Sequence, residues 1–323
     1  MSVGASLQLY ALEPGTLAQA LAGGLGVALS PFEDRAFEDG EHKWRPLCDP
    51  AGSDAYVLAG LHGDTHASPH DRLCRLLMFL ATLRDHGATR VTALVPYLAY
   101  ARKDQQTQPF DPLSLRYVAQ LFEAVGTQQM VVLEAHNPAA LQNAFRCPVR
   151  HLAGHSAMAS AVACLVGTEA LAVASPDPGG ARRARLWQES LALSLGRPVR
   201  FALVDKRRSA GVQRAAAAVA GDVQGMTVLL LDDLIASGQT LQRAAQALRL
   251  AGARRVFACA THGLFVGEAA QALAGDSIER ILVTDSVPAD RLPLDAPLRA
   301  KLQVLSAAPL FMKAVQASRN SQE

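Results

Sequence analysis

Two adjacent carboxylates follow an apolar run in the second half of the chain. Residues 228–231 are Val-Leu-Leu-Leu, and Asp232 and Asp233 come directly after them. If the apolar run is a buried strand of a parallel sheet, the carboxylates lie at its carboxyl end, where open α/β sheets bind ligands. There they could accept hydrogen bonds from the vicinal hydroxyls of a ribose, or they could simply cap the next helix.

The loop after the acid pair has the chemistry of a phosphate site. It consists of Ala236, Ser237, Gly238, Gln239 and Thr240, and an Ala- and Leu-rich stretch follows. Backbone N–H groups at the start of a helix can donate to a phosphate, and Ser237 and Thr240 add hydroxyl donors. The acids and the loop together favour a sugar-phosphate site over a plain turn.

Three cations follow another apolar run. Lys206, Arg207 and Arg208 come shortly after residues 201–204, Phe-Ala-Leu-Val. A lysine on its flexible stem suits a group that moves during reaction, whereas an arginine can hold a phosphate through two parallel N–H bonds. Phosphoryl transfer spreads negative charge over oxygen atoms, so cations placed there lower its barrier. An isolated triplet of this kind would more often be a solvated basic turn.

The elements that would position these groups alternate along the chain. Short apolar runs predict strands at 55–58, 91–95, 130–133, 170–173, 201–204, 228–231, 256–259, 281–283 and 302–306. Longer stretches with helical spacing predict helices, for example at 72–85, 113–125, 181–195 and 240–250. Such alternation is typical of βαβ units, so we expect an α/β fold whose mainly parallel sheets are flanked by helices.

A repeated local pattern indicates two similar domains. Residues 87–91, Gly-Ala-Thr-Arg-Val, end a helix and open a strand, and residues 252–256, Gly-Ala-Arg-Arg-Val, do the same about half a chain length later. Glycine suits the left-handed residue just past a helix, so chance could also produce this echo. The 323 residues fit two domains of about 150 residues each. We expect domains at 1–150 and 151–306, with a last helix at about 307–318 that can pack on the first.

Composition excludes several classes of protein. Lys and Arg number 31 against 29 Asp and Glu, without long blocks of like charge, so we expect no nucleic-acid partner and no acidic membrane surface. No run of eighteen apolar residues and no basic leader occur, which predicts neither a membrane span nor a signal peptide. The five cysteines are scattered singly, as expected of free thiols in the cytoplasm.

Two side-chain clusters are less informative. His62, His66 and His70 are spaced by four, but a glycine and a proline among them break any helix that could align them as metal ligands. The three arginines within residues 182–185 are too few for a nucleic-acid stripe. We expect these arginines to line a phosphate-rich cleft or to cap a domain interface.

Segments throughout the chain resemble, in the same order, the motifs of the ribose-phosphate diphosphokinases, the synthetases of phosphoribosyl diphosphate (PRPP). The acid pair itself is typical of the type I phosphoribosyl-diphosphate fold. The resemblance spans about residues 30–318. Besides the acid pair it is carried by residues 35–41 (R-A-F-E-D-G-E, against R-F-x-D-G-E), 96–104 (P-Y-L-A-Y-A-R-K-D, against P-Y-[FL]-x-Y-A-R-Q-D), 175–184 (S-P-D-P-G-G-A-R-R-A, against S-P-D-x-G-G-x-x-R-A), 205–208 (D-K-R-R in both) and 260–265 (A-T-H-G-L-F, against A-T-H-x-x-F).

The resemblance implies a fold and a reaction. The fold is two tandem phosphoribosyltransferase-like domains. The reaction is transfer of the β,γ-diphosphoryl group of Mg-ATP to the 1-hydroxyl of ribose 5-phosphate, which gives PRPP and AMP for nucleotide biosynthesis. In this family the R-F-x-D-G-E loop reaches into a neighbouring subunit's site, so the resemblance also implies a homo-oligomer, at least a dimer.

The resemblance also assigns roles to individual residues. The catalytic cations would be Lys206 and Arg208. Ribose 5-phosphate would be bound by Arg208, Asp232, Asp233, Ala236, Ser237, Gly238, Gln239 and Thr240. ATP would be bound by Phe37, Asp39, Gly40, Glu41, Arg102 and Lys103. Mg²⁺ would be held by His136 and Asp177, either directly or, for the imidazole, through a water molecule, because magnesium seldom binds nitrogen.

The chain departs from the family pattern near both substrates. Ala236, Ser237 and Gln239 replace an acidic or hydroxyl residue, Thr and Gly in the ribose-phosphate loop, which predicts a lowered affinity for ribose 5-phosphate. Lys103 replaces Gln, and Gln105 with its neighbour replaces a basic pair. The loss of those cations predicts weak control by phosphate and ADP.

These departures leave two alternatives beside the active synthetase. A catalytically silent protein that associates with an active synthetase would explain the weakened ribose-phosphate loop. A phosphoribosyltransferase that uses PRPP would share the acid pair. It would explain neither the second domain nor the P-Y-L-A-Y-A-R stretch at 96–102.

Overall fold

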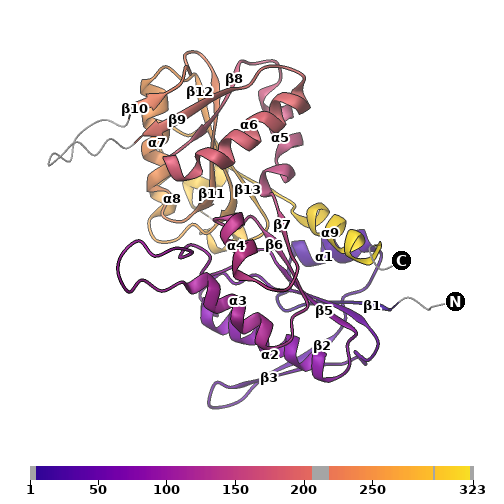
Figure 1. Cartoon of the computed structure of the whole chain (residues 1–323). Helices are drawn as coiled ribbons and strands as arrows, with labels where there is room; N and C mark the ends of the chain where they lie inside the picture. The colour runs from indigo at the N-terminus through magenta and orange to yellow at the C-terminus, as the bar shows by residue number, and fades with distance from the viewer. Residues whose placement is uncertain (1–4, 206–217, 294, 321–323) are drawn as a thin grey trace. The chain divides into compact units, whose positions relative to one another are not determined.

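The computed structural model describes residues 5–205, 218–293 and 295–320, and both Lys206 and Arg208 lie outside these ranges. The chain divides into two compact units (Figure 1). Unit 1 comprises Met1–Ala153 together with Ser306–Glu323, and unit 2 comprises Gly154–Leu305. Unit 1 therefore contains both ends of the chain.

Unit 1 is built on a five-stranded parallel sheet in the order β1-β4-β5-β6-β7. Its strands are β1 (Leu7–Ala11), β4 (Asp54–Leu58), β5 (Arg90–Val95), β6 (Gln129–Leu133) and β7 (Val149–Leu152). Every residue of β4 is buried, as expected for a central strand with both faces covered. The antiparallel hairpin of β2 (Phe32–Ala36) and β3 (His42–Pro46) forms a separate two-stranded sheet.

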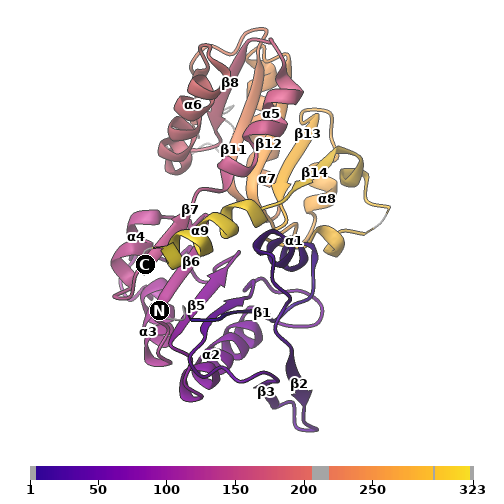
Figure 2. The ribbon, with the colours of Figure 1, turned by 90° about the vertical axis from the view of Figure 1, so that its right-hand side faces the viewer.

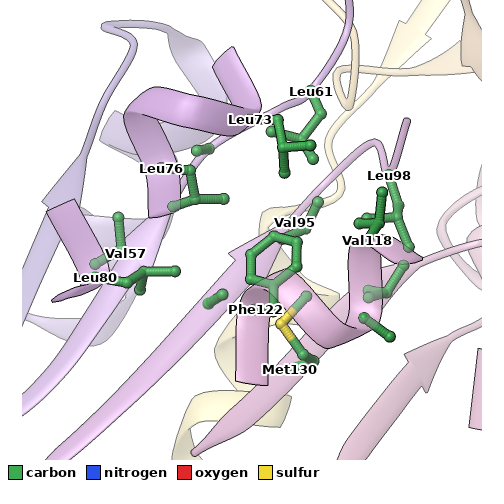
Figure 3. Close-up of a cluster of buried hydrophobic side chains, with 14 of the residues drawn as sticks. Val57, Leu61, Leu73, Leu76, Leu80, Val95, Leu98, Val118, Phe122 and Met130 are labelled. Carbon is green, nitrogen blue, oxygen red and sulfur yellow. The ribbon is translucent and has the colours of Figure 1, made fainter. Parts of the chain in front are cut away.

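Helices cover both faces of the sheet in unit 1. One face packs against α2 (Pro69–Asp85), α3 (Ser114–Ala124) and α4 (Pro138–Ala144), in a core whose members include Leu76, Val95, Phe122 and Met130 (Figure 3). The other face packs against α1 (Thr16–Leu25) and α9 (Ala308–Asn320), which lie side by side (Figure 2). The last helix of the chain thus completes the core of the first unit.

Unit 2 has a seven-stranded sheet in the order β10-β9-β8-β11-β12-β13-β14. Its strands are β8 (Leu171–Ser175), β9 (Arg200–Asp205), β10 (Ala218–Ala220), β11 (Thr227–Ile235), β12 (Arg255–Gly263), β13 (Arg280–Thr284) and β14 (Leu302–Leu305). Neighbouring strands are parallel except for β9 and β10, which are antiparallel. This sheet is therefore mixed, with its antiparallel strand at the edge.

The central strand β11 is buried between two helical layers. Val228 and Leu230 pack with α7 (Gln239–Leu250) and α8 (Ala269–Ala272), whereas Leu229 and Leu231 pack with α5 (Ala159–Val166) and α6 (Ala181–Leu195). Side chains alternate between the faces of a strand. The same alternation directs Asp232 toward the α7 face and Asp233 toward the α6 face.

The two sheets and their helices confirm the predicted α/β fold. Strands lie at all the positions that the apolar runs indicated, and α6 has the bounds that the helical spacing predicted. Strands β1, β2, β3, β7 and β10 were not predicted, because they are short or rich in polar residues. Among the residues that the structure describes, no helix combines the length and apolarity needed to cross a membrane.

Candidate active site

The acid pair lies at the carboxyl end of β11. Asp232 is in register with Ala260 of β12, and its Oδ1 accepts a hydrogen bond of 2.9 Å from the backbone N–H of Asp233. The Asp233 side chain is only 6% exposed. Burial raises the pKa of Asp232 well above its usual range, and the neighbouring Asp233 raises it further. Two carboxyl groups this close and this buried therefore hold a proton more readily than exposed ones do.

The loop that follows β11 is fixed by backbone contacts. Ile235 O accepts from Leu264 N at 2.9 Å, and Ala236 O accepts from Val266 N at 3.0 Å. Gly238 has φ +72°, and a Cβ there would lie 2.6 Å from Leu273 Cγ. Only glycine satisfies both the backbone conformation and the space at this position.

Gln239 is the first residue of α7. It is exposed, and its Oε1 accepts from Arg243 Nη2 at 3.1 Å, one helical turn further on. The first N–H groups of α7 have no partner within the helix itself, which is the general property that makes helix starts bind anions. The hydrogen bond with Arg243 therefore holds the Gln239 side chain along the first turn of α7.

The Asp177 loop is at the same edge of the sheet as the acid pair, because β8 pairs directly with β11. Asp177 Oδ1 accepts from Gly180 N at 3.2 Å, and Ser175 Oγ donates to Asp177 O at 2.6 Å. A Cβ on Gly180 would lie 2.8 Å from Ser175 Oγ, so this tight turn requires glycine. The turn leads straight into α6 and fixes where that helix begins.

In unit 1 the tip of the β2–β3 hairpin presents an aromatic face. Phe37 is 44% exposed, and the Arg35 guanidinium carbon lies 5.4 Å from the centre of its ring. Asp39 Oδ1 accepts from Glu41 N at 3.0 Å, and Gly40 has φ +88°. Asp39 thus closes its own turn, which is the ordinary role of an Asp-Gly pair, while Phe37 and Glu41 are exposed beside it.

The Arg102 loop follows β5 in the same unit. Lys103 Nζ donates to Thr107 Oγ1 at 3.0 Å and forms an ion pair with Asp111. Hydrogen bonds from Lys103 and Thr107 hold the pKa of Asp111 well below its usual range. Lys103 therefore organises its own loop, and the side chain beside it, Arg102, is exposed.

His136 lies on the loop after β6, beside Asn137, whose structural role was not predicted. Asn137 caps α4 by accepting from Ala139 N at 3.2 Å, and its Nδ2 donates to Asp104 Oδ2 at 2.7 Å. This bond joins the His136 loop to the Arg102 loop. An asparagine followed by proline at a helix start is a recognised capping signal and could have identified the residue.

Histidine, cysteine and carboxylate side chains form no cluster of three that could hold a metal ion within the described ranges. His136 belongs to unit 1 and Asp177 to unit 2. A magnesium ion retains water and needs only one or two protein carboxylates when a substrate supplies phosphate oxygens. Asp177 offers one carboxylate of this kind.

Two mainly parallel sheets flanked by helices, with an acid pair and a phosphate-type loop at the end of a central strand, define a phosphoribosyltransferase-like α/β protein. Residues 10–126 match the family model of the N-terminal domain of ribose phosphate pyrophosphokinase, and residues 205–321 match that of the phosphoribosyl synthetase-associated domain. The chain belongs to the ribose-phosphate pyrophosphokinase family.

Relatives resemble the chain over nearly its whole length. The ribose-phosphate pyrophosphokinase of Aquifex aeolicus is 33% identical over 93% of this chain and 92% of its own, and that of Caldanaerobacter subterraneus is 34% identical over 93% and 90%. The crystal structure of phosphoribosylpyrophosphate synthetase from Mycobacterium smegmatis matches with a TM-score of 0.85 and 32% identity, covering 98% of this chain and 99% of its own. The fold of two tandem phosphoribosyltransferase-like domains is thereby confirmed.

Proposed function

We propose that the protein is an active ribose-phosphate diphosphokinase, which transfers the diphosphoryl group of Mg-ATP to the 1-hydroxyl of ribose 5-phosphate. The observation that carries the proposal is the buried acid pair at the end of β11, followed by a loop that opens α7. The chain also matches relatives that are named for this reaction, over 92% and 90% of their lengths. The products are PRPP, a precursor for nucleotide biosynthesis, and AMP.

The ribose end of the reaction belongs to unit 2. Asp232 and Asp233 accept hydrogen bonds from the vicinal ribose hydroxyls, and the 5-phosphate binds to residues 236–240 at the start of α7. There the positive end of the helix dipole and the backbone N–H groups favour an anion. The shared burial that raises the pKa of Asp232 also keeps water from competing for these bonds.

The nucleotide end draws on unit 1. Phe37 covers one face of adenine, Glu41 and Asp39 accept from its exocyclic amine, Gly40 lets the hairpin tip turn, and Arg102 pairs with phosphate oxygens. Lys103 contributes indirectly, because its ion pair with Asp111 shapes the loop that carries Arg102. Because the hairpin tip is a protruding turn, we also propose that it serves a neighbouring subunit in a homo-oligomer of at least two chains.

The cations of residues 206–208 would act during the transfer itself. Lys206 follows the migrating diphosphoryl group and Arg208 clamps a phosphate; both assignments rest on the sequence. When bound, Mg²⁺ neutralises charge on the triphosphate, and Asp177 is the carboxylate that would hold it, with His136 directly or through water. The five cysteines are free thiols, which suits the cytoplasm that we propose as its location.

The decisive measurement is incubation of the pure protein with Mg-ATP and ribose 5-phosphate while AMP and PRPP are quantified. We expect equal amounts of both products, and no AMP when ribose 5-phosphate is omitted. A protein that forms neither product alone but changes the rate of an added active synthetase would instead be the silent associated protein. Consumption of PRPP with a free base would identify a phosphoribosyltransferase.

A further inference from the structure

Three arginines at the start of α6 have three different environments. Arg182 is exposed, and the Arg185 guanidinium lies 4.3 Å from the centre of the Phe201 ring on β9. Arg183 is directed inward, with a side chain only 14% exposed and its Nη2 3.9 Å from Asp233 Oδ2. Of these three arginines, Arg183 is therefore the one that lies at the acid pair.

The position of Arg183 follows from the periods of helix and strand. Arg183, Trp187 and Leu191 recur every four residues, so they lie on one face of α6. Trp187 and Leu191 pack in the same core as Leu229 and Leu231, which precede Asp233 on alternate positions of β11. On the helix, Arg183 comes one turn before Trp187. On the strand, Asp233 comes two positions after Leu231, on the same face. The two charged side chains consequently meet at the edge of that core.

A tight turn directly before α6 lies close to the Arg183 side chain. Gly180 immediately precedes the helix, and its N–H is capped by Asp177. A guanidinium nitrogen of Arg183 lies 4.0 Å from the position that a Gly180 Cβ would occupy. The Arg183 side chain therefore lies alongside the glycine turn, within van der Waals distance of that position.

We propose that Arg183 is a positioning residue for ribose 5-phosphate, whose guanidinium pairs with the Asp233 carboxylate and orients it as a hydrogen-bond acceptor for a ribose hydroxyl. This inference rests on the proposed function of the acid pair. Two adjacent buried carboxylates repel each other as anions, and an opposite charge on one of them relieves that repulsion. Consistent with this, the charge of Arg183 lowers the pKa of Asp232, opposing the effects of burial and of Asp233.

Calorimetric titration with ribose 5-phosphate tests the proposal on the full chain. We expect Arg183→Gln to weaken binding about tenfold or more, because the acceptor loses a charge-assisted partner. Arg183→Lys should recover most of the affinity, since it restores the cation. Arg182→Gln, the matched removal of the neighbouring exposed charge, should change it less than twofold. Unaltered affinity in Arg183→Gln, or equal losses in Arg183→Gln and Arg183→Lys, would overturn the proposal.

Two further readouts separate positioning from folding. In steady-state assays Arg183→Gln should raise the KM for ribose 5-phosphate and leave the KM for ATP within about twofold. In the Asp233→Asn background the same change should have little additional effect, because its partner is already gone. This double variant also removes the unpaired buried charge, so it remains informative if Arg183→Gln alone does not fold. Additive losses would overturn the proposal. Wild-type protein that binds no ribose 5-phosphate would instead refute the proposed function itself.

Discussion

The two units share one strand order and use it differently. In unit 1 the sheet runs β1-β4-β5-β6-β7, and in unit 2 the strands β8-β11-β12-β13-β14 occupy the same successive places. The Gly-Ala-x-Arg-Val echo lies at the start of β5 and of β12, the third strand in each series. The echo is therefore consistent with duplication of one α/β unit.

Each unit also contains a hairpin between its first and second core strands. In unit 1, β2 and β3 form a sheet of their own, whereas in unit 2, β9 joins the main sheet beside β8 and carries β10 at the edge. The connection within each hairpin carries proposed site residues: Phe37, Asp39 and Glu41 in unit 1, and Lys206 with Arg208 in unit 2. The residues proposed for nucleotide recognition and those proposed for charge stabilisation thus come at the same place in the strand sequence of their units.

The acid pair has no counterpart in unit 1. Asp54 of β4 pairs with Arg90 just as Thr227 of β11 pairs with Arg255, so the two strands can be aligned residue by residue. Asp232 and Asp233 then correspond to Ala59 and Gly60, both buried. A carboxylate at an apolar position would need a partner to offset its desolvation. The proposed sugar site therefore rests on an acid pair in unit 2 that unit 1 lacks.

Removing Lys206, the first of the three cations that follow β9 in the sequence, should have the largest effect. We expect Lys206→Ala to lower kcat by roughly 10²- to 10³-fold, because its charge acts mainly as the diphosphoryl group moves. Nucleotide affinity, measured by calorimetry with a non-hydrolysable ATP analogue, should change little. A variant with more than a tenth of the wild-type kcat would show that the two hairpins do not differ in the way proposed.

Changing the acid pair should mainly affect one substrate. We expect Asp232→Asn to raise the KM for ribose 5-phosphate by about one to two decades, because the amide presents a donor where the hydroxyl needs an acceptor. The KM for ATP should stay within about twofold. An increased KM for ATP alone would mean that the substrates are assigned to the wrong units.

The hairpin tip of unit 1 should contribute binding and little chemistry. We expect Phe37→Ala to raise the KM for ATP about tenfold through loss of stacking on the purine, with kcat within about threefold. Phe37→Tyr, which retains the ring, serves as the matched control and should behave like the wild type. If kcat falls as far as it does in Lys206→Ala, the division of labour between the hairpins is wrong.

The smallest predicted effect is on stability. Burial raises the pKa of Asp232 above its unfolded value, so the folded state is favoured while this group is protonated and loses that advantage as pH rises from about 4 upward. Asp232→Asn cannot ionise. Its free energy of unfolding relative to the wild type should therefore increase from pH 5 to pH 9, by on the order of 1 kcal/mol, or about 2 °C in Tm.

Thermal unfolding of ligand-free protein across this pH range checks the sign. Asp222→Asn, at an exposed carboxyl that Arg200 pairs with, is a useful contrast, because Gln224 N–H and Arg200 lower the pKa of Asp222. A lowered pKa gives stability that is lost on acidification, so this variant should show no gain at high pH. A stability difference for Asp232→Asn that shrinks toward pH 9 would contradict the proposed burial of the acid pair.

Sequence patterns predicted the buried strands because each is a continuous apolar run with both faces covered. They did not predict the β2–β3 hairpin, whose residues read F-E-D-R-A and H-K-W-R-P. Its charges pair across the strands: Glu33 contacts Lys43 and Arg45, and Asp34 contacts His42. Such cross-strand pairs become visible only once the register is known.

In the candidate site, too, some features could be predicted from the sequence and others required the folded structure. The identity of Asp232 and Asp233 as a strand-end acid pair followed from local order. The assignment of Lys103 to phosphate did not include its ion pair with Asp111, which depends on how the loop folds back. To tell that Arg183, and not Arg182, faces the acid pair, one must know which face of α6 packs on β11. Helical spacing gives the face of a helix but not the strand that it covers.

The placement of α9 has a consequence for biosynthesis. The core that contains Leu9, Leu21 and Val131 also needs Phe311 and Val315, which leave the ribosome after all of unit 2 has been made. At ordinary rates of synthesis, roughly 10–30 s separate the first part of unit 1 from its last helix. During that interval the apolar face of unit 1 that α9 later covers is exposed to solvent. Nascent chains should therefore recruit chaperones there. A stop codon anywhere in unit 2 would leave both units incomplete.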